Sequence, residues 1–173
     1  MKSYVLGGGC FWCLDSAFIQ FNGVIDVEVG YSGGWIDNPS YEAVCSAETG
    51  HAEVVKITFD ETVISAEVVL GIFFTIHDPR QLNRQGHDVG PQYRSAMFYQ
   101  DDAQKTEFEA ALSRAAALWP GTLVTEISPL INYWPAEEYH QDFFAKNPNQ
   151  GYCLAVVQPK VIKARQAFSE YLN

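Results

Sequence analysis

Three consecutive glycines, Gly7 to Gly9, lie between a short apolar run and a helical pattern near the start of the chain. Residues 3–6 are typical of a strand, residues 13–21 have apolar side chains at helical spacing, and residues 24–29 are again typical of a strand. Glycine tolerates backbone conformations that other residues avoid, so the triplet lets the chain bend sharply from the strand into the helix. This opening constrains the fold to one in which strands and helices are interspersed.

The rest of the chain continues this alternation. Ser65 is placed to cap a helix, with Ile64 and Val69 spaced as a hydrophobic staple. We expect further strands over residues 51–59, 95–99, 123–127 and 154–157, and helices over residues 41–45, 65–76, 102–118, 135–145 and 160–172. Without repeats or linkers, this predicts a single catalytic domain over residues 1–173, an α/β (α+β) two-layer fold with a mixed sheet. Two long polar segments, 31–50 and 77–94, are where function is expected.

The charge balance of the chain narrows the classes of partner. Eleven Lys and Arg against 21 Asp and Glu give a net charge of −10, and the pI is near 4.7. Such an acidic surface repels nucleic acids and anionic membranes. The sequence shows neither an apolar run long enough to cross a bilayer nor the apolar core of a signal peptide. We therefore expect a cytoplasmic protein, with no nucleic-acid or membrane partner, whose cysteines are kept reduced. No exposed hydrophobic stripe argues for a dimer, so we expect a monomer.

Cys10 and Cys13 form a C-x-x-C pair at the predicted start of the first helix. Backbone N–H groups at a helix N-terminus stabilise a thiolate, so we expect an exposed Cys10 sulfur with a lowered pKa. Phe11 and Trp12 stand between the two cysteines and would wall an apolar pocket beside that sulfur. The alternative is that the aromatic residues belong to the core and the cysteines are inert. The whole string favours a reactive thiol.

Glu53 lies in an alternating run with Val55, Ile57 and Phe59, which is the face expected to be buried. A buried carboxyl group without a cationic partner has a raised pKa and keeps its proton, which suits a general acid. The same residue placed at a solvated strand end would have no chemical role, and periodicity alone does not decide between these two interpretations.

Three polar residues in the long loops, Tyr41, Tyr93 and Asp88, offer phenol and carboxyl groups, although residues of this kind are most often turn formers. The four histidines are scattered, and each is expected to be a capping or surface residue. With a single C-x-x-C pair and no second ligand pair, the pattern does not predict a metal site.

Nine strings, in order along nearly the whole chain, closely resemble the class A peptide methionine sulfoxide reductase family. They are Gly9-Cys10-Phe11-Trp12-Cys13, Gly30-Tyr31-Ser32-Gly33-Gly34, Asn38-Pro39-Ser40-Tyr41-Glu42, Thr49-Gly50-His51-Ala52-Glu53, His77-Asp78-Pro79, Arg84-Gln85-Gly86, Gln92-Tyr93-Arg94-Ser95, Ala136-Glu137-Glu138-Tyr139-His140-Gln141 and Gly151-Tyr152-Cys153. The resemblance implies a ferredoxin-like mixed sheet and reduction of methionine-S-sulfoxide, free or in peptides, which repairs oxidised proteins. It further implies thioredoxin as the external dithiol reductant and no bound cofactor.

The resemblance also implies a role for each matching residue. Cys10 matches the nucleophile that attacks the sulfoxide sulfur and becomes a sulfenic acid, and Glu53 matches the acid that protonates the sulfoxide oxygen. Tyr41 and Tyr93 match the phenols that hydrogen-bond that oxygen, and Asp88 matches a supporting carboxylate. The wall that holds the substrate methyl group is matched by Phe11 and Trp12.

The residue that resolves the sulfenic acid into a disulfide is the point where the chain departs from many members of the family. Cys153 matches the usual position, but the expected strand over residues 154–157 would hold it in place, and the glycine-rich tail is absent. Cys13 lies one helical turn from Cys10 and is favoured on reach, with Cys153 as the alternative. Cys45 matches a cysteine without a chemical role and is expected to be a small buried side chain.

Three other functions remain open at this point. A thioredoxin-like disulfide oxidoreductase would share the C-x-x-C pair but would need neither Glu53 nor the loop tyrosines. A module that binds methionine-containing peptides through Phe11 and Trp12 would survive Cys10→Ser. A zinc module is the weakest alternative.

Overall fold

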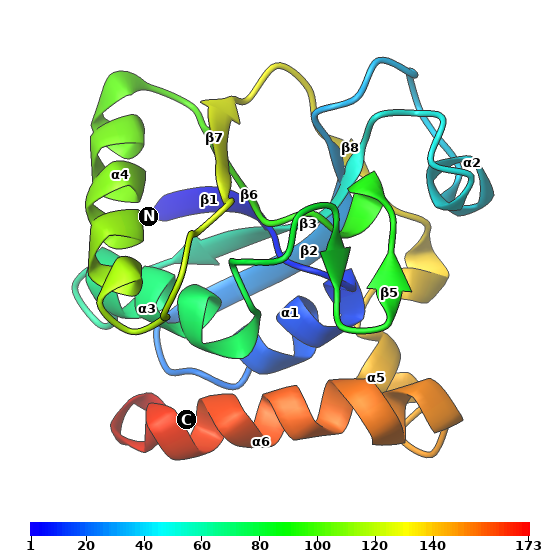
Figure 1. Cartoon of the computed structure of the whole chain (residues 1–173). Coiled ribbons are helices and arrows are strands. Elements are labelled where there is room, and N and C mark those ends of the chain that lie inside the picture. The colour runs from blue at the N-terminus through cyan, green and yellow to red at the C-terminus, as the bar shows by residue number, and fades with distance from the viewer.

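A mixed six-stranded sheet forms the centre of the molecule, and the computed structural model describes all residues from 1 to 173 (Figure 1). Its strands follow the spatial order β7-β6-β1-β3-β2-β8. They are β1 (Lys2–Gly7), β2 (Val24–Ser32), β3 (Ala52–Phe59), β6 (Ala96–Tyr99), β7 (Glu126–Pro129) and β8 (Trp134–Pro135). The long strands carry the apolar alternation that the sequence shows at residues 51–59.

The central four strands have the ferredoxin-like arrangement that was expected. Strand β1 is antiparallel to both β3 and β6, and β3 is antiparallel to β2. Leu6 pairs with Val55 on one side and with Met97 on the other. Strand β7 extends the sheet by pairing parallel to β6, which makes the sheet mixed. Because β1 is a central strand, Gly7 at its C-terminal end lies between the neighbouring strands β6 and β3.

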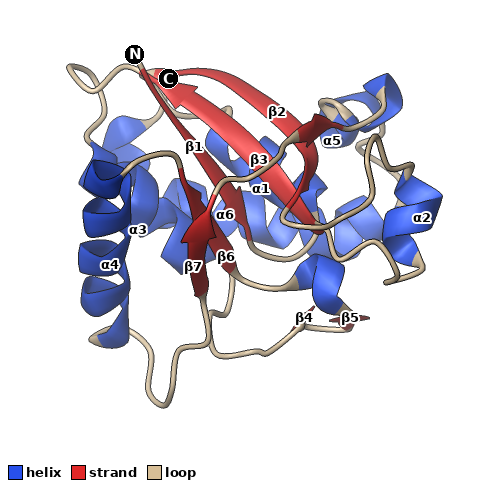
Figure 2. Cartoon of the chain, turned by 90° about the horizontal axis from the view of Figure 1, so that it is seen from above, coloured by secondary structure: helices blue, strands red, loops and turns tan.

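The main helices cover one face of the sheet. They are α1 (Phe11–Phe18), α3 (Ala66–Ile76) and α4 (Asp102–Ala116), and α6 (Gln158–Ala167) packs beneath α1 and α3 (Figure 1). Seen from above, the strands lie over α1 and α6 (Figure 2). A core of 27 buried residues fills the space between sheet and helices. On the opposite face a smaller cluster around Val54 and Phe98 is covered by the segment that contains Leu130 and Tyr133.

Polar caps set the starts of the helices as the sequence indicates. The Ser65 hydroxyl accepts a hydrogen bond from the Val68 N–H, and Ile64 and Val69 beside it are both buried. Asp101 caps α4 in the same way through the Gln104 N–H. The short helix α2 (Tyr41–Cys45) begins after Ser40, whose hydroxyl accepts from the Ala43 N–H.

The predicted helix over residues 135–145 is wrong. Trp134 and Pro135 form β8, which pairs with the end of β2, and a 3-10 turn over Glu138–His140 follows. The short helix α5 (Phe143–Lys146) begins only after Asp142, which has a left-handed backbone with φ 57°. The pairing of Pro135 with Gly30 holds the start of the segment in the sheet, so the segment folds as separate turns.

The predicted strand over residues 154–157 is also wrong. Residues Cys153–Val157 form a π-helical segment that runs directly into α6. Within it only Cys153 and Val157 are buried, four residues apart, which is the spacing of one helix face. A short apolar run does not distinguish a strand from a buried helix, and here packing against α1 selects the helix.

The second long loop contains a small hairpin of β4 (Arg84–Gln85) and β5 (Asp88–Val89), followed by a 3-10 turn over Pro91–Tyr93. The hairpin lies beside the start of α1, where its Gln85 side chain is next to Gly9. None of the helices combines the length and the apolar character that a membrane span requires.

Candidate active site

The glycine turn places Cys10 at the N-cap of α1, with the extended backbone angles that this position needs. A Cβ atom on Gly8 would lie 2.9 Å from the buried ring of His77. Gly9 has φ +89°, and a Cβ atom there would lie 2.7 Å from the Gln85 side chain. The chain can therefore turn into α1 at this point only if both positions lack a side chain.

The Cys10 thiol is buried, with 7% of the residue exposed, in a cluster that also contains Cys13, Cys153 and Val157. Burial raises the pKa of the Cys10 thiol, and the neighbouring Cys13 sulfur raises it further. The nearby backbone N–H of Trp12 and the Tyr152 hydroxyl group act in the opposite direction but are outweighed. The expectation of an exposed sulfur with a lowered pKa is therefore wrong: loss of hydration outweighs the helix N-terminus.

The Glu53 side chain is also buried, with 1% of the residue exposed, and its Oε1 accepts a hydrogen bond from the Phe11 N–H at 3.2 Å. The second oxygen, Oε2, has no partner. Burial raises the pKa of Glu53 well above its usual range, and the proximity of Cys10 and Asp88 acts in the same direction. The protonated form of the carboxyl group is therefore favoured over the carboxylate, and Oε2 is the oxygen free to carry the proton.

The loop residues Tyr41, Tyr93 and Asp88 surround the same point. Tyr41 and Tyr93 are half-buried, and the pKa of each phenol is raised by burial and then by the nearby Glu53 carboxyl group. Both phenols remain neutral and can donate hydrogen bonds. Asp88 lies within the electrostatic reach of both Glu53 and Tyr93. The structure thus brings together five residues that are far apart in the sequence: Cys10, Tyr41, Glu53, Asp88 and Tyr93.

Phe11 and Trp12 take different positions at the start of α1. Phe11 is fully buried in the main core, whereas Trp12 is half-buried and faces the cluster around Cys10. The indole ring of Trp12 stacks on Phe143 with a centroid distance of 3.8 Å and an interplanar angle of 6°. Its Nε1–H donates to His140 Nδ1 at 3.0 Å. Trp12 is therefore held on two sides, so its ring offers a fixed apolar surface.

The sequence assigned no role to three residues of the site. The Tyr152 hydroxyl donates to Asp88 Oδ2. Glu137 accepts from the Tyr31 hydroxyl at 2.8 Å and from the Tyr41 N–H at 2.9 Å. His140 supports Trp12. All three lie in strings that match the family, and this was the only signal in the sequence that could have singled them out.

The expectation of a buried Cys45 is wrong: Cys45 is exposed, because the short helix α2 turns the neighbouring Val44 toward the core instead. The expectation that each histidine is a capping or surface residue is met for two of the four. His87 is exposed, and His77 is the C-cap residue of α3, with a ring nitrogen hydrogen-bonded to Phe73 O. The other two, His51 and His140, are buried.

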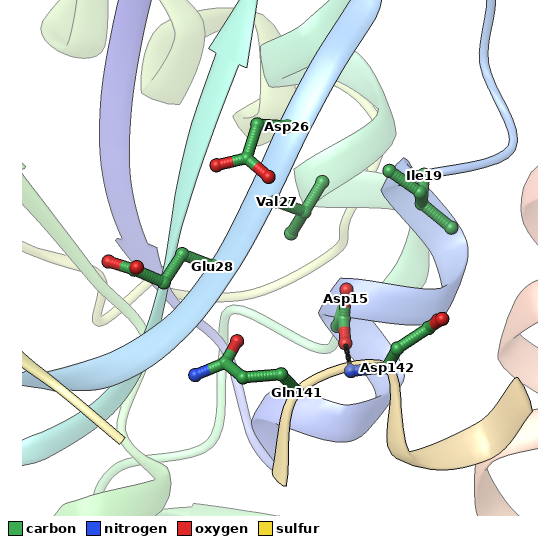
Figure 3. Close-up of a pocket in the computed structure, with 7 residues that line it drawn as sticks. All are labelled: Asp15, Ile19, Asp26, Val27, Glu28, Gln141 and Asp142. Atoms are coloured by element: carbon green, nitrogen blue, oxygen red, sulfur yellow. Dashed lines mark hydrogen bonds between the residues drawn. The ribbon is translucent and has the colours of Figure 1, made fainter. Parts of the chain in front are cut away.

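Two hollows lie near α1. One, of about 490 Å³, is lined by Asp88, Tyr152 and Lys160, and its Tyr152 packs against the cluster that contains Cys10. The other, of about 330 Å³, lies at the far end of the helix and is strongly acidic, with Asp15, Asp26, Glu28 and Asp142 on its walls (Figure 3). There Asp15 Oδ2 accepts from the Asp142 N–H at 2.8 Å. The first hollow shares Asp88 with the group of five site residues, whereas none of the five lines the acidic hollow.

A cysteine sulfur and a carboxyl group with a raised pKa share one water-poor site on a ferredoxin-like sheet. Such a pair suits a substrate whose oxygen must gain a proton before sulfur can attack. Two phenols add neutral hydrogen-bond donors from a second direction. The fold and the site together indicate an oxidoreductase.

The model of the family described as peptide methionine sulfoxide reductase matches residues 2–172. A relative with this name from Clavibacter michiganensis subsp. michiganensis is 60% identical over 173 residues, covering 100% of this chain and 99% of the relative. One from Nautilia profundicola is 56% identical over 165 residues, covering 94% of each. The chain belongs to the peptide methionine sulfoxide reductase family, and it is an oxidoreductase that reduces methionine sulfoxide.

Solved structures agree with this assignment. The reduced form of Mxr1 from Saccharomyces cerevisiae superposes with a TM-score of 0.83 at 34% identity, covering 88% of each chain. Methionine sulfoxide reductase A of Corynebacterium diphtheriae has a TM-score of 0.80 at 33% identity, covering 89% of this chain and 78% of that one.

Proposed function

We propose that the protein reduces the S-epimer of methionine sulfoxide, free or in peptides, through direct attack by Cys10. The observation that carries the proposal is the pairing of the buried Cys10 thiol with Glu53, whose Oε2 is free to deliver a proton. In this mechanism Glu53 protonates the sulfoxide oxygen while Tyr41 and Tyr93 hydrogen-bond it, and Asp88 supports the site through Tyr152. Phe11 and Trp12 form the apolar wall for the substrate methyl group.

The oxygen atom passes from substrate to enzyme in the first step. Cys10 loses its proton and its sulfur bonds to the sulfoxide sulfur, while Glu53 protonates the oxygen. The oxygen then moves to the Cys10 sulfur as the adduct's sulfur–sulfur bond and the bond from the methionine sulfur to oxygen both break. Methionine leaves, Cys10 becomes a sulfenic acid, and the proton lost by Cys10 restores the Glu53 carboxyl group. A second thiol then condenses with the sulfenic acid to give a disulfide and one water molecule. An external dithiol reduces that disulfide and is itself oxidised, which returns both cysteines to their thiol forms.

We favour Cys13 as the resolving thiol, with Cys153 as the alternative. The Cys13 N–H donates to the Cys10 carbonyl at 3.1 Å, so the two cysteines share the first turn of α1. Cys153 is in the same buried cluster, and the argument that a strand holds it away no longer applies. For Cys153 to meet Cys10, however, a continuous helix would have to shift, whereas Cys13 needs only fraying of one turn.

Thioredoxin is the proposed reductant, and repair of oxidised proteins the proposed role. Mxr1 from Saccharomyces cerevisiae has been solved in complex with Trx2, with a TM-score of 0.59 to this chain. Three thiols close together in a reduced compartment would be regenerated by such a dithiol protein. We place the enzyme in the cytoplasm as a monomer that needs no bound cofactor.

Mass spectrometry with peptide mapping tests this function. The reduced protein is mixed with one equivalent of each epimer of N-acetyl-methionine sulfoxide, and both the methionine product and the cysteine linkages are followed. We expect one methionine per protein from the S-epimer only, together with a Cys10–Cys13 disulfide. A Cys10→Ser variant, treated identically, should release none.

Each other outcome has a distinct meaning. A Cys10–Cys153 linkage would keep the reductase mechanism and replace the resolving thiol. Product from the R-epimer would overturn the proposed stereochemistry. If neither epimer changed the thiol state, the proposed attack by Cys10 would be refuted.

A further inference from the structure

The hollow of about 490 Å³ next to the cysteine cluster lies between the β4–β5 hairpin and the C-terminal helical segment. The hairpin contributes His87 and Asp88 to its walls, and the helical segment contributes Tyr152, Val156 and Lys160. Because Asp88 and Tyr152 also belong to the active site, the hollow is continuous with it. Any substrate atoms beyond the sulfoxide group can extend into this space.

Lys160 points its ammonium group toward the start of α1. The Nζ atom lies 3.8 Å from the position that a Cβ atom would take on Gly9, the residue before the nucleophile. The lysine is half-buried and forms neither an ion pair nor a side-chain hydrogen bond, in a chain with a net charge of −10. Burial lowers the pKa of the nearby His77 to about 4, and the Lys160 charge acts in the same direction. A partly desolvated ammonium group without an anion is an open position for one.

The distance along a methionine side chain matches this placement. Four bonds separate its sulfur from its carboxyl carbon, which is about 5 Å in an extended conformation. A sulfoxide sulfur in contact with Cys10 would therefore bring a carboxylate on the same residue to the vicinity of Lys160. Asp88 is the acidic residue on the wall of the hollow, and it already accepts a hydrogen bond from Tyr152. Its charge would repel a substrate carboxylate, which favours a position of that carboxylate next to Lys160.

We propose that Lys160 binds a carboxylate of the substrate, so that the enzyme favours methionine sulfoxide that carries a free carboxylate close to the sulfur. That carboxylate is either the α-carboxylate of the free amino acid or of a C-terminal residue, or the side chain of an acidic residue that follows in a peptide. The proposal rests on the proposed function, because it requires the sulfoxide to meet Cys10. Lys160 is a specificity residue in this scheme and does not touch the reacting atoms.

The test compares matched substrates on the same preparation of enzyme. N-acetyl-methionine-(S)-sulfoxide is compared with its N-methylamide, and the measured quantity is the ratio of the two kcat/KM values. A partly exposed ion pair predicts a ratio of about five for the native protein, which falls as salt is added. Lys160→Met should bring the ratio to about one, and Lys160→Arg should restore it. Lys163→Met is the control, because Lys163 is on the same helix but lies over the Trp119 ring.

A third substrate distinguishes the two sources of the carboxylate. An N-acetylated dipeptide amide, with methionine-(S)-sulfoxide followed by glutamate, is compared with its glutamine counterpart. A glutamate preference that Lys160→Met abolishes assigns the site to acidic peptides, whereas a preference confined to the first pair assigns it to the α-carboxylate. The proposal would be overturned if the native protein showed a ratio of one. It would also be overturned if the ratio of about five persisted in Lys160→Met. If the native protein reduced none of the substrates, the proposed function itself would fail.

Discussion

Glu53 on the central strand β3 accepts a hydrogen bond through Oε1 from the Phe11 N–H in the first turn of α1. The bond joins the sheet to the helix that begins at Cys10, and it fixes which carboxyl oxygen is left free. Because the backbone N–H already occupies Oε1, the proton of the neutral carboxyl group is directed to Oε2. The position of the acid relative to the nucleophile is thus determined by the backbone of the helix itself.

Glu53→Gln should lower kcat/KM by about 100-fold or more, the usual contribution of a general acid. The amide oxygen of glutamine can still accept from the Phe11 N–H, so the fold should be retained. Activity of the native protein should decline as pH rises through the raised pKa of Glu53, because the ionised carboxyl group has no proton to give. The pH profile of Glu53→Gln should lack that decline, and an unchanged profile would argue against the acid role.

Cys13→Ser should still release one methionine per protein in a single turnover but should lose at least about tenfold in steady-state turnover with thioredoxin. The sulfenic acid at Cys10 should persist and react with a 1,3-diketone probe, which mass spectrometry detects. Cys45→Ser is the control, because Cys45 is exposed and outside the cysteine cluster. Persistence of the sulfenic acid in Cys153→Ser instead would identify Cys153 as the resolving thiol.

Asp15→Asn should change how stability depends on pH. Burial raises the pKa of Asp15 to about 7, whereas the unfolded chain loses this proton near pH 4. The folded protein binds the extra proton between these values, so this residue makes stability fall as pH rises from about 4 to 7. Asparagine keeps an acceptor for the Asp142 N–H (Figure 3), and because it does not ionise, it adds no such decrease in stability.

The unfolding free energy of Asp15→Asn minus that of the native protein should therefore be larger at pH 8 than at pH 5, by on the order of 2 kcal/mol. Urea unfolding at the two pH values measures this, and the comparison cancels the contributions of all other titrating groups. A gain of equal size at both values would show that Asp15 is already ionised in the folded protein at pH 5.

His140→Ala should raise the KM for N-acetyl-methionine sulfoxide by several-fold with a smaller effect on kcat. The change removes the acceptor of the Trp12 indole N–H, and the ring is then held only by its stacking on Phe143. The tryptophan fluorescence should shift as well. Glu109→Ala is the control, because Glu109 is exposed on α4 and lines neither the surroundings of Trp12 nor the hollow beside Lys160. Equal changes in KM for both variants would contradict the positioning role.

The order and type of most elements could be predicted from the sequence because the signals are local. The alternation at Val55, Ile57 and Phe59 reports the face that packs on the helices, and it places Glu53 on the same buried side. The predictions failed where long-range contacts decide the structure. Pro135 is drawn into the sheet by Gly30, and the segment that begins at Cys153 is helical because it packs on α1.

The candidate site shows the same division. The position of Cys10 at the helix start follows from a local pattern of glycines and aromatic residues, but its burial does not. Its surroundings come from Cys153 and Tyr152, more than 140 residues further along the chain. A pKa that depends on hydration set by distant residues cannot be estimated from the nearest ones.

That covering of Cys10 has a consequence for the newly made chain. The walls of the cysteine cluster come from both ends of the sequence, and the ribosome delivers Cys153 and Val157 long after Cys10. Until they arrive, Cys10 and Cys13 lack this cover and are open to oxidants, and the pKa of Cys10 is not yet raised by burial. Protection of the thiols is therefore gained only on completion of synthesis, and a preparation that folds slowly will need a reductant from the start.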